Sequence, residues 1–80
     1  DIVSRFDDKI VVTEVKTRQT AEIGEPYLSV TKSKQKQIIK AANLYILEFD
    51  IHEETRFDIV SIVHNSYGTR LEHIENAFTT

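Results

Sequence analysis

The chain has 80 residues, no cysteine and a formal net charge of −3 at pH 7, so it forms one domain at most and has neither disulfides nor thiolate metal sites. The sequence shows no membrane-spanning apolar run and no signal peptide, which predicts a cytoplasmic protein without a membrane partner. It starts without Met, inside a predicted strand. We therefore expect a single, N-terminally truncated domain over residues 1–80.

The positive and negative charges are unevenly distributed along the chain. Residues 9–40 hold seven Lys or Arg against three Glu, whereas residues 41–80 hold two Arg against seven acidic residues. Such asymmetry permits a basic face beside an acidic one, but on charge alone an ordinary solvated helix face explains the lysines better.

The first half of the chain predicts a hairpin followed by a loop. Residues 1–5 and 10–17 form the two strands, since IVVTEVKT is dense in β-branched residues, and the Asp pair between them favours a turn. Residues 18–29 carry Gly24 and Pro26 and are expected to form a loop.

A helix is predicted over residues 34–48, capped by Thr31 or Ser33. Its apolar side chains recur at helical spacing, and the stripe consists of Ile38, Ala42, Tyr45 and Phe49.

Two more strands are expected after the helix. Residues 56–63 (RFDIVSIV) are continuous β-formers, a turn follows at Asn65, Ser66 and Gly68, and residues 69–74 form the last strand before a short tail. The order β-β-α-β-β predicts an α/β (α+β-like) domain with one mixed sheet and one helix.

Charged residues that could bind a metal ion or take part in catalysis lie near the carboxyl end of the strand over residues 10–17. Glu14 and Lys16 share a face of this strand because side chains alternate, and open α/β sheets place ligand sites at strand carboxyl ends. The carboxylate can hold a divalent cation through oxygen, and the lysine can orient water. Asp1 lies on the preceding strand, and a symmetric hairpin brings it close to Glu14.

A Glu-x-Lys triplet on a strand is a weak signal. Taken alone, Glu14 and Lys16 are better explained as a cross-strand salt bridge, which contributes little stability. Gln35 lies on the apolar stripe of the helix, where it either ties the preceding loop or reaches the site near Glu14 and Lys16. These two readings stay open.

The remaining polar residues suggest surface or structural roles. Asp58 is expected to pair with Arg56 or Arg70, and the three histidines have no metal-ligand spacing.

Several segments in this order resemble the uncharacterised bacterial YraN family. They are EVKTR at 14–18, GEP at 24–26, VTKSKQ at 30–35, AANLYI at 41–46, RFDIV at 56–60 and HIENAF at 73–78. That family is similar to archaeal Holliday junction resolvases. The resemblance therefore implies a restriction-endonuclease-like core of the PD-(D/E)xK type.

The resemblance also implies a metal site. Asp1 matches by spacing the Asp of a Glu-Ile-Asp segment in the family, so Asp1 and Glu14 would ligate Mg²⁺ or Mn²⁺ with the backbone carbonyl of Val15. Lys16 would position the hydrolytic water. Family members carry a helix and a strand before this Asp, and without them the sheet would expose an edge that invites another chain.

Further residues follow from the same resemblance. Gln35 matches a Lys-Gln pair in the family's helix and becomes a fourth catalytic candidate. From their charge, Arg18, Lys34 and Lys36 are second-rank candidates for contact with DNA phosphates. The implied partners are DNA and a second copy of the chain in a homodimer, with no small-molecule cofactor.

The leading hypothesis is therefore a divalent-metal-dependent endonuclease that hydrolyses DNA phosphodiester bonds, branched or structured DNA included. One alternative is a catalytically inactive nucleic-acid-binding module of the same fold, and the other is a structural or dimerisation domain.

Overall fold

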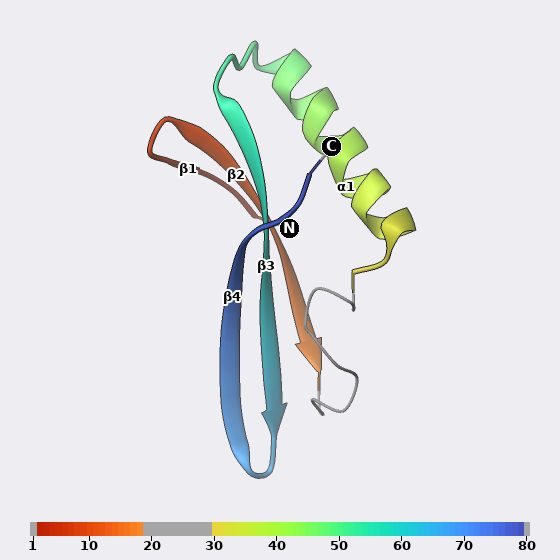
Figure 1. Ribbon diagram of the computed structural model, residues 1–80, viewed down its shortest axis with the longest axis vertical. Helices are drawn as coiled ribbons and strands as arrows, with labels where there is room; N and C mark the ends of the chain where they lie inside the picture. Colours follow the sequence, from red (N-terminus) through yellow and green to blue (C-terminus); the bar gives the residue numbers. More distant parts are fainter. Residues whose placement is uncertain (1, 19–29, 80) are drawn as a thin grey trace.

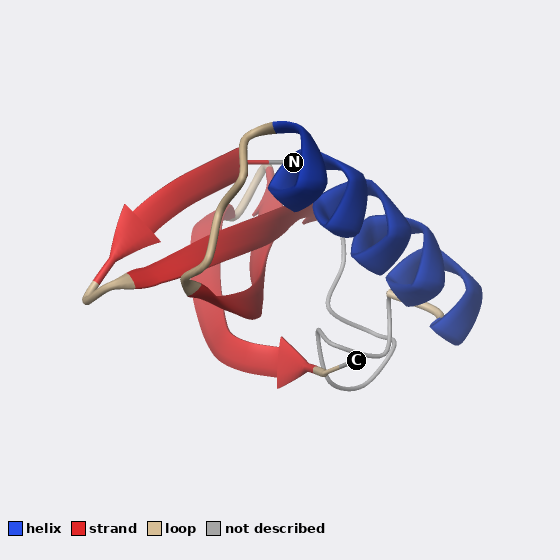
Figure 2. Cartoon of the chain, turned by 90° about the horizontal axis from the view of Figure 1, so that it is seen from above, coloured by secondary structure: helices blue, strands red, loops and turns tan. Residues whose placement is uncertain are grey.

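The computed structural model describes residues 2–18 and 30–79 as a mixed sheet with one helix across one of its faces (Figures 1 and 2). The elements are β1 (Ile2–Phe6), β2 (Lys9–Arg18), α1 (Lys32–Glu48), β3 (Glu54–Asn65) and β4 (Gly68–Phe78). The four strands lie in the order β1-β2-β3-β4. The predicted β-β-α-β-β order is confirmed, and it fits a restriction-endonuclease-like core.

The hairpin β1–β2 forms as the sequence predicts. Its strands are antiparallel, with Ile2 opposite Thr13 and Phe6 opposite Lys9. Asp7 and Asp8 adopt φ values of 49° and 61°, a left-handed conformation that Asp tolerates better than most residues. All five residues of β1 are exposed, and β1 is an edge strand of the sheet.

The helix α1 begins at Lys32, two residues earlier than expected. Of the two candidate caps, Thr31 takes the role, because its side chain accepts a hydrogen bond from the backbone N–H of Lys34 at 3.2 Å.

The apolar stripe of α1 is buried over its middle only. Ile38 and Ala42 are buried, as predicted, but Tyr45 and Phe49 are 38% and 59% exposed. Their rings pack on each other, with centroids 4.7 Å apart, so the end of the stripe forms its own aromatic pair at the surface.

The strands β2 and β3 are parallel, and α1 provides the crossover between them. Ile10, Val11 and Val12 are all buried, which confirms that β2 is covered on both faces at its beginning. The core between the sheet and the helix consists of Ile10, Val12, Val30, Ile38, Ala42, Phe57, Ile59 and Phe78.

The strand β4 is longer than predicted. The expected strand over residues 69–74 continues to Phe78, so the predicted tail was wrong. A β-bulge accompanies this extension, and Asn76 adopts a φ of 52° there. Beyond the bulge, Phe78 stacks on Phe57 with centroids 5.1 Å apart, and this contact holds the strand end on the core.

Within the part of the chain that the structure describes, no helix is both long and apolar enough to cross a membrane.

Candidate functional site

Glu14 is a buried carboxylate on the helix-facing side of the sheet. It follows Ile10 and Val12 on the same face of β2, and it is only 6% exposed. Its neighbour across the parallel pair is Ile59, which is fully buried. Within residues 2–18 and 30–79, the Oε2 atom of Glu14 has no hydrogen-bond partner. A buried polar atom in this state costs free energy, which singles the residue out.

Lys16 is two residues further along β2 on the same face as Glu14. It pairs with Ser61 and is partly exposed. Neither Glu14 nor Lys16 forms an ion pair with another described residue. The cross-strand salt bridge, which explained these residues best on sequence grounds, is therefore not formed in this part of the chain. Val15 points to the opposite face, where it is partly exposed, and its role as a carbonyl ligand stays a prediction.

Asp1 lies outside the described residues, so its predicted role as a metal ligand stays a prediction. The register next to it is established, since Ile2 pairs with Thr13, the residue before Glu14. Among the described residues, no group of three His, Cys, Asp or Glu side chains is placed to hold a metal ion. A metal ion at Glu14 would therefore need further ligands from outside this set, such as Asp1, backbone carbonyls or water.

Gln35 ties the beginning of α1 to the preceding segment. Its Nε2 donates a hydrogen bond to the carbonyl of Val30 at 3.0 Å. The loop-tying contact that the sequence offered as one reading is thus present, and the second reading, a reach toward Glu14, stays a prediction. Gln35 also lines a cavity of about 440 Å³ together with Val30 and Phe78.

The predicted DNA-contact residues lie on two elements. Lys34 is partly buried and Lys36 is exposed, both in the first turns of α1, where the first turn has no acidic side chain. Arg18 ends β2, and its Nε is buried without a hydrogen-bond partner among the described residues. Their contact with DNA stays a prediction.

The structure adds a polar cluster around Asp58, on the face of the sheet opposite Glu14. Arg56 donates to both carboxylate oxygens, from Nε at 2.9 Å and from Nη2 at 2.8 Å. The backbone N–H of Asn76 donates to Oδ1 at 3.0 Å, and His73 Nε2 lies 2.8 Å from Oδ2. The predicted pair of Asp58 with Arg56 is confirmed, while Arg70 lies near Glu72 instead.

These contacts change the ionisation of Asp58. Burial raises its pKa, but the hydrogen bonds from Arg56, Asn76 and His73 outweigh burial, so the pKa lies below the ordinary value of 3.8. The hydrogen bond between Arg56 and Asp58 also raises the pKa of the Arg56 guanidinium. Asp58 is therefore an anion held by fixed donors.

Sequence reasoning placed His73 at the surface or an edge, and its side chain is exposed, but its contact with Asp58 was not predicted. The Arg-x-Asp spacing on one strand predicts the pair of Arg56 and Asp58. The approach of Asn76 depends on the bulge in β4, which leaves no recognisable pattern in the sequence. His73 lies in the regular part of the ladder, opposite Val60 and diagonal to Asp58, so the hairpin register itself brings it close.

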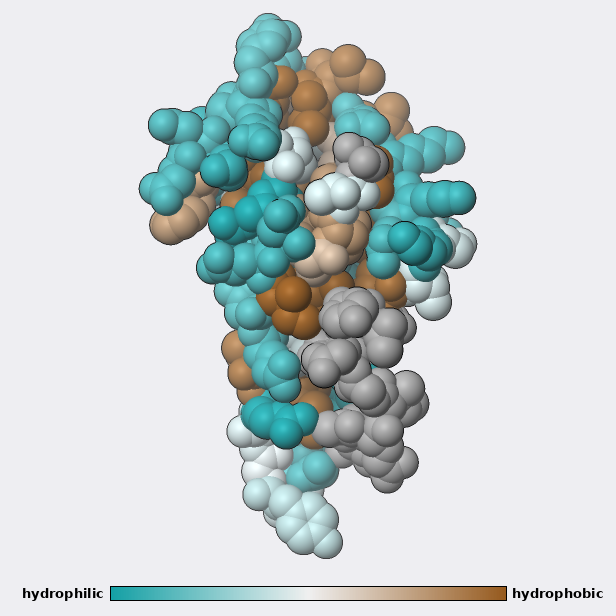
Figure 3. Space-filling model, viewed as in Figure 1, coloured by the Kyte–Doolittle hydropathy of each residue, from teal (hydrophilic) through white to brown (hydrophobic). Residues whose placement is uncertain are grey.

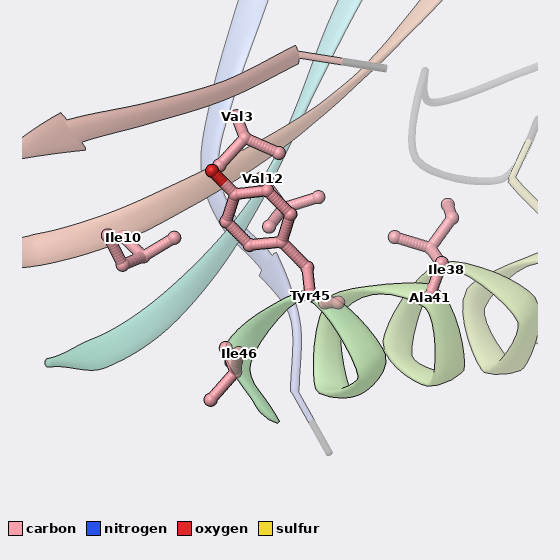
Figure 4. Close-up of a pocket in the computed structure, with 8 residues that line it drawn as sticks. Val3, Ile10, Val12, Ile38, Ala41, Tyr45 and Ile46 are labelled. Carbon is pink, nitrogen blue, oxygen red and sulfur yellow. The ribbon is translucent and has the colours of Figure 1, made fainter. Parts of the chain in front are cut away.

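An apolar pocket of about 200 Å³ lies between α1 and the β1–β2 hairpin (Figure 4). Tyr45 extends its ring from α1 toward the strands, with its hydroxyl beside Val3. Val12 from β2 and Ile38 from α1 also line the pocket. The lining offers no ionisable group other than the phenol, so this pocket supplies packing rather than catalytic groups.

Comparison with known proteins identifies the family of the chain. The family model described as "Uncharacterised protein family UPF0102" matches residues 1–62. A UPF0102 protein of Christiangramia forsetii is 41% identical over 78 residues, which cover 98% of this chain and 66% of the relative. A UPF0102 protein of Geobacter metallireducens is 43% identical over 79 residues, covering 98% of this chain and 65% of the relative.

The chain is shorter than these proteins. A UPF0102 protein of Phocaeicola vulgatus, 37% identical over 78 residues, is covered over 64% of its length. The chain thus spans slightly less than two thirds of the length of the curated bacterial relatives that it matches. The family match over most of the chain, together with these identities, shows that the chain belongs to the uncharacterised protein family UPF0102, the YraN family whose motifs its sequence resembles.

Proposed function

We propose that the chain carries the active-site strand of a divalent-metal-dependent endonuclease that hydrolyses DNA phosphodiester bonds, branched DNA included. The observation that supports this proposal best is the buried carboxylate of Glu14, whose Oε2 has no hydrogen-bond partner within residues 2–18 and 30–79. A carboxylate oxygen with free coordination capacity fits a hard divalent cation, which prefers oxygen ligands.

The residues around Glu14 have defined roles in this proposal. Glu14 and Asp1 would hold Mg²⁺ or Mn²⁺, with the carbonyl of Val15 as a further oxygen ligand. Such a cation supplies Lewis-acid stabilisation of the negative charge on a phosphate. Lys16, two residues along the same face and partly exposed, would orient the attacking water and stabilise charge on the phosphate oxygens.

Gln35 would act as a positioning residue. Its amide already donates to the carbonyl of Val30, so it ties the first turn of α1 to the segment that precedes the helix. Arg18, Lys34 and Lys36 would bind the DNA backbone through charge, and such binding weakens as salt rises.

The test is a cleavage assay of the full-length protein on linear and four-way-branched DNA with Mg²⁺ or Mn²⁺. Wild-type protein should cut at least one substrate, and Glu14→Gln and Lys16→Met should each lower the rate by about 100-fold or more. Glu48→Gln, which alters an exposed carboxylate at the far end of α1, serves as the matched control. Equal cleavage by all four proteins would count against the proposal.

A second candidate is a nucleic-acid-binding module that does not cut. The first turn of α1, which carries lysines and no acidic side chain, favours it, since such a surface suits contact with phosphates. Salt-dependent DNA binding that survives Glu14→Gln, with no cleavage under any metal, would select this function over the first.

A further inference from the structure

The tip of the β3–β4 hairpin presents an aromatic ring to solvent. Tyr67 is 97% exposed, in a turn of two residues between the paired Asn65 and Gly68. Figure 1 shows that this hairpin extends well beyond the end of α1, so the tip is the lowest point of the molecule in that view. Figure 3 shows the same tip as pale to teal, away from the hydrophobic side chains between sheet and helix. The ring therefore takes no part in the core.

The backbone beneath Tyr67 is held by local hydrogen bonds. The N–H of Tyr67 donates to Asn65 Oδ1 at 2.9 Å, and His64 Nδ1 and Thr69 Oγ1 are hydrogen-bonded across the strands at 2.6 Å. Gly68 has a φ of 136°, which residues with a side chain rarely adopt. The backbone that carries the ring is thus already ordered, so contact with a partner costs little further backbone entropy.

A hollow of about 380 Å³ lies beside the ring. Its lining includes Val63 and Arg70 as well as Tyr67 and the turn. Arg70 is exposed, and its Nε is 3.8 Å from Glu72 Oε1, too far for a strong hydrogen bond. A planar ligand stacked on the Tyr67 ring would therefore have the Arg70 guanidinium within reach.

Few acidic residues lie at the hairpin end of the sheet in the described part of the chain. None occurs from Ile59 to Leu71, and Glu72 follows Arg70 by two residues on the same strand. Val63 pairs with Arg18 on one side and with Arg70 on the other, so the two guanidinium groups belong to one row across the sheet. The other end of the molecule is rich in acids, namely Asp7, Asp8, Glu48, Asp50, Glu53 and Glu54. Among the described residues, charge is thus polarised along the sheet, and the hairpin end attracts anions.

We propose that the hairpin tip is a nucleic-acid contact in which Tyr67 stacks on an unpaired base and Arg70 binds the adjacent phosphate. Aromatic rings stack on bases of any sequence, but they reach a base face only where the base has left the duplex stack. The inference rests on the proposed function and extends it. It assigns to the same protein a preference for DNA with single-stranded or splayed bases.

The first test measures binding without metal, in EDTA, so that cleavage plays no part. The probes are an oligo-dT of about 20 nucleotides and a duplex of the same length. Binding to each probe is measured by fluorescence anisotropy. Tyr67→Ala should weaken binding of the single strand about tenfold and leave duplex binding nearly unchanged, while Tyr67→Phe should keep the wild-type affinity. Leu47→Ala, which removes another highly exposed apolar side chain, is the control and should change neither.

The second test uses Arg70→Ala. It should weaken both DNA forms and flatten the dependence of log affinity on log salt by roughly one unit of slope or slightly less. Single-strand binding by Tyr67→Ala within twofold of wild type, or an equal loss on both probes, would overturn the inference, as would the absence of any DNA binding by wild-type protein at low salt.

The inference and the proposed function fail separately. Stacking at Tyr67 without cleavage under Mg²⁺ or Mn²⁺ would retain the contact and reject the nuclease. Cleavage that depends on Glu14 but with single-strand binding insensitive to Tyr67 would retain the nuclease and reject the contact.

Discussion

Glu14 and Asp58 are both buried carboxylates on adjoining strands, and they differ in almost every other respect. Glu14 lies on the face covered by α1, whereas Asp58, which pairs with Thr13, points to the opposite face. Asp58 accepts hydrogen bonds from Arg56 and Asn76 and contacts His73. Glu14 keeps one oxygen without a hydrogen bond among the described residues.

The difference separates two reasons for burying a charge. The charge of Asp58 is matched by a guanidinium and by fixed N–H donors, so the cluster joins β3 to the bulge of β4 and supports the fold. Within residues 2–18 and 30–79 the charge of Glu14 has no such compensation, so it weakens the fold unless something else binds it. Uncompensated buried polar groups are typical of sites that bind ligands.

The largest effect is expected from breaking the compensated carboxylate. Asp58→Ala should lower the free energy of unfolding by about 3 kcal/mol, because it leaves the Arg56 guanidinium and the Asn76 N–H without their acceptor. Chemical denaturation measures this loss. Glu72→Ala on β4, where the carboxylate is half exposed, should change stability by less than about 0.5 kcal/mol. Equal effects of the two substitutions would show that the Asp58 cluster is not structural.

Acid should remove part of the same contribution. The folded-state pKa of Asp58 is lowered, so its stabilisation is present above the unfolded value of 3.8 and is lost as the pH falls toward the folded value. The difference in unfolding free energy between wild type and Asp58→Asn should therefore be constant near neutral pH and shrink below about pH 4. A difference that stays constant throughout the acid range would contradict the lowered pKa.

Divalent metal should affect Glu14 and not Asp58. At a Mn²⁺ concentration about ten times its dissociation constant, wild-type protein should gain about 1.4 kcal/mol of stability, seen as a rise in Tm. Glu14→Gln should abolish this gain in stability. Asp58→Asn should show the same gain, although its stability without metal is lower than that of wild type. A gain that survives Glu14→Gln would place the metal elsewhere.

The smallest effect is a gain in stability from removing the uncompensated charge. Glu14→Leu, measured in EDTA, should raise the free energy of unfolding by about 1 kcal/mol, because the substitution replaces a buried carboxylate by a hydrocarbon of similar volume. The exposed Glu54→Leu should leave stability unchanged. A loss in Glu14→Leu would indicate that the carboxylate has a structural partner.

Local patterns in the sequence predicted the elements of this fold well. The β-branched run over β2, the Asp pair of the first turn and the helical spacing of Ile38 and Ala42 each depend on neighbours within a few residues. The extension of β4 to Phe78 could not be predicted, because it depends on a bulge and on the stacking of Phe78 against the distant Phe57.

The candidate site was predictable only in part. Alternation along β2 placed Glu14 and Lys16 on one face, and the structure confirms that placement. The burial of Glu14 depends on α1 and β3, which are distant in sequence, so the strand alone suggested a salt bridge. The exposure of Tyr67 likewise became visible only once the hairpin and its length were known.

The parallel pairing of β2 with β3 has a consequence for how the chain acquires this structure. Each of the hairpins β1–β2 and β3–β4 closes over a short loop, whereas every residue pair between β2 and β3 is separated by 45 positions, as between Val12 and Phe57. Closing so long a segment costs chain entropy before any contact compensates it, so we expect this pairing to be the slow step of folding. On that expectation Glu14 would lose its water only at that step, and the carboxylate would stay hydrated until the fold is nearly complete.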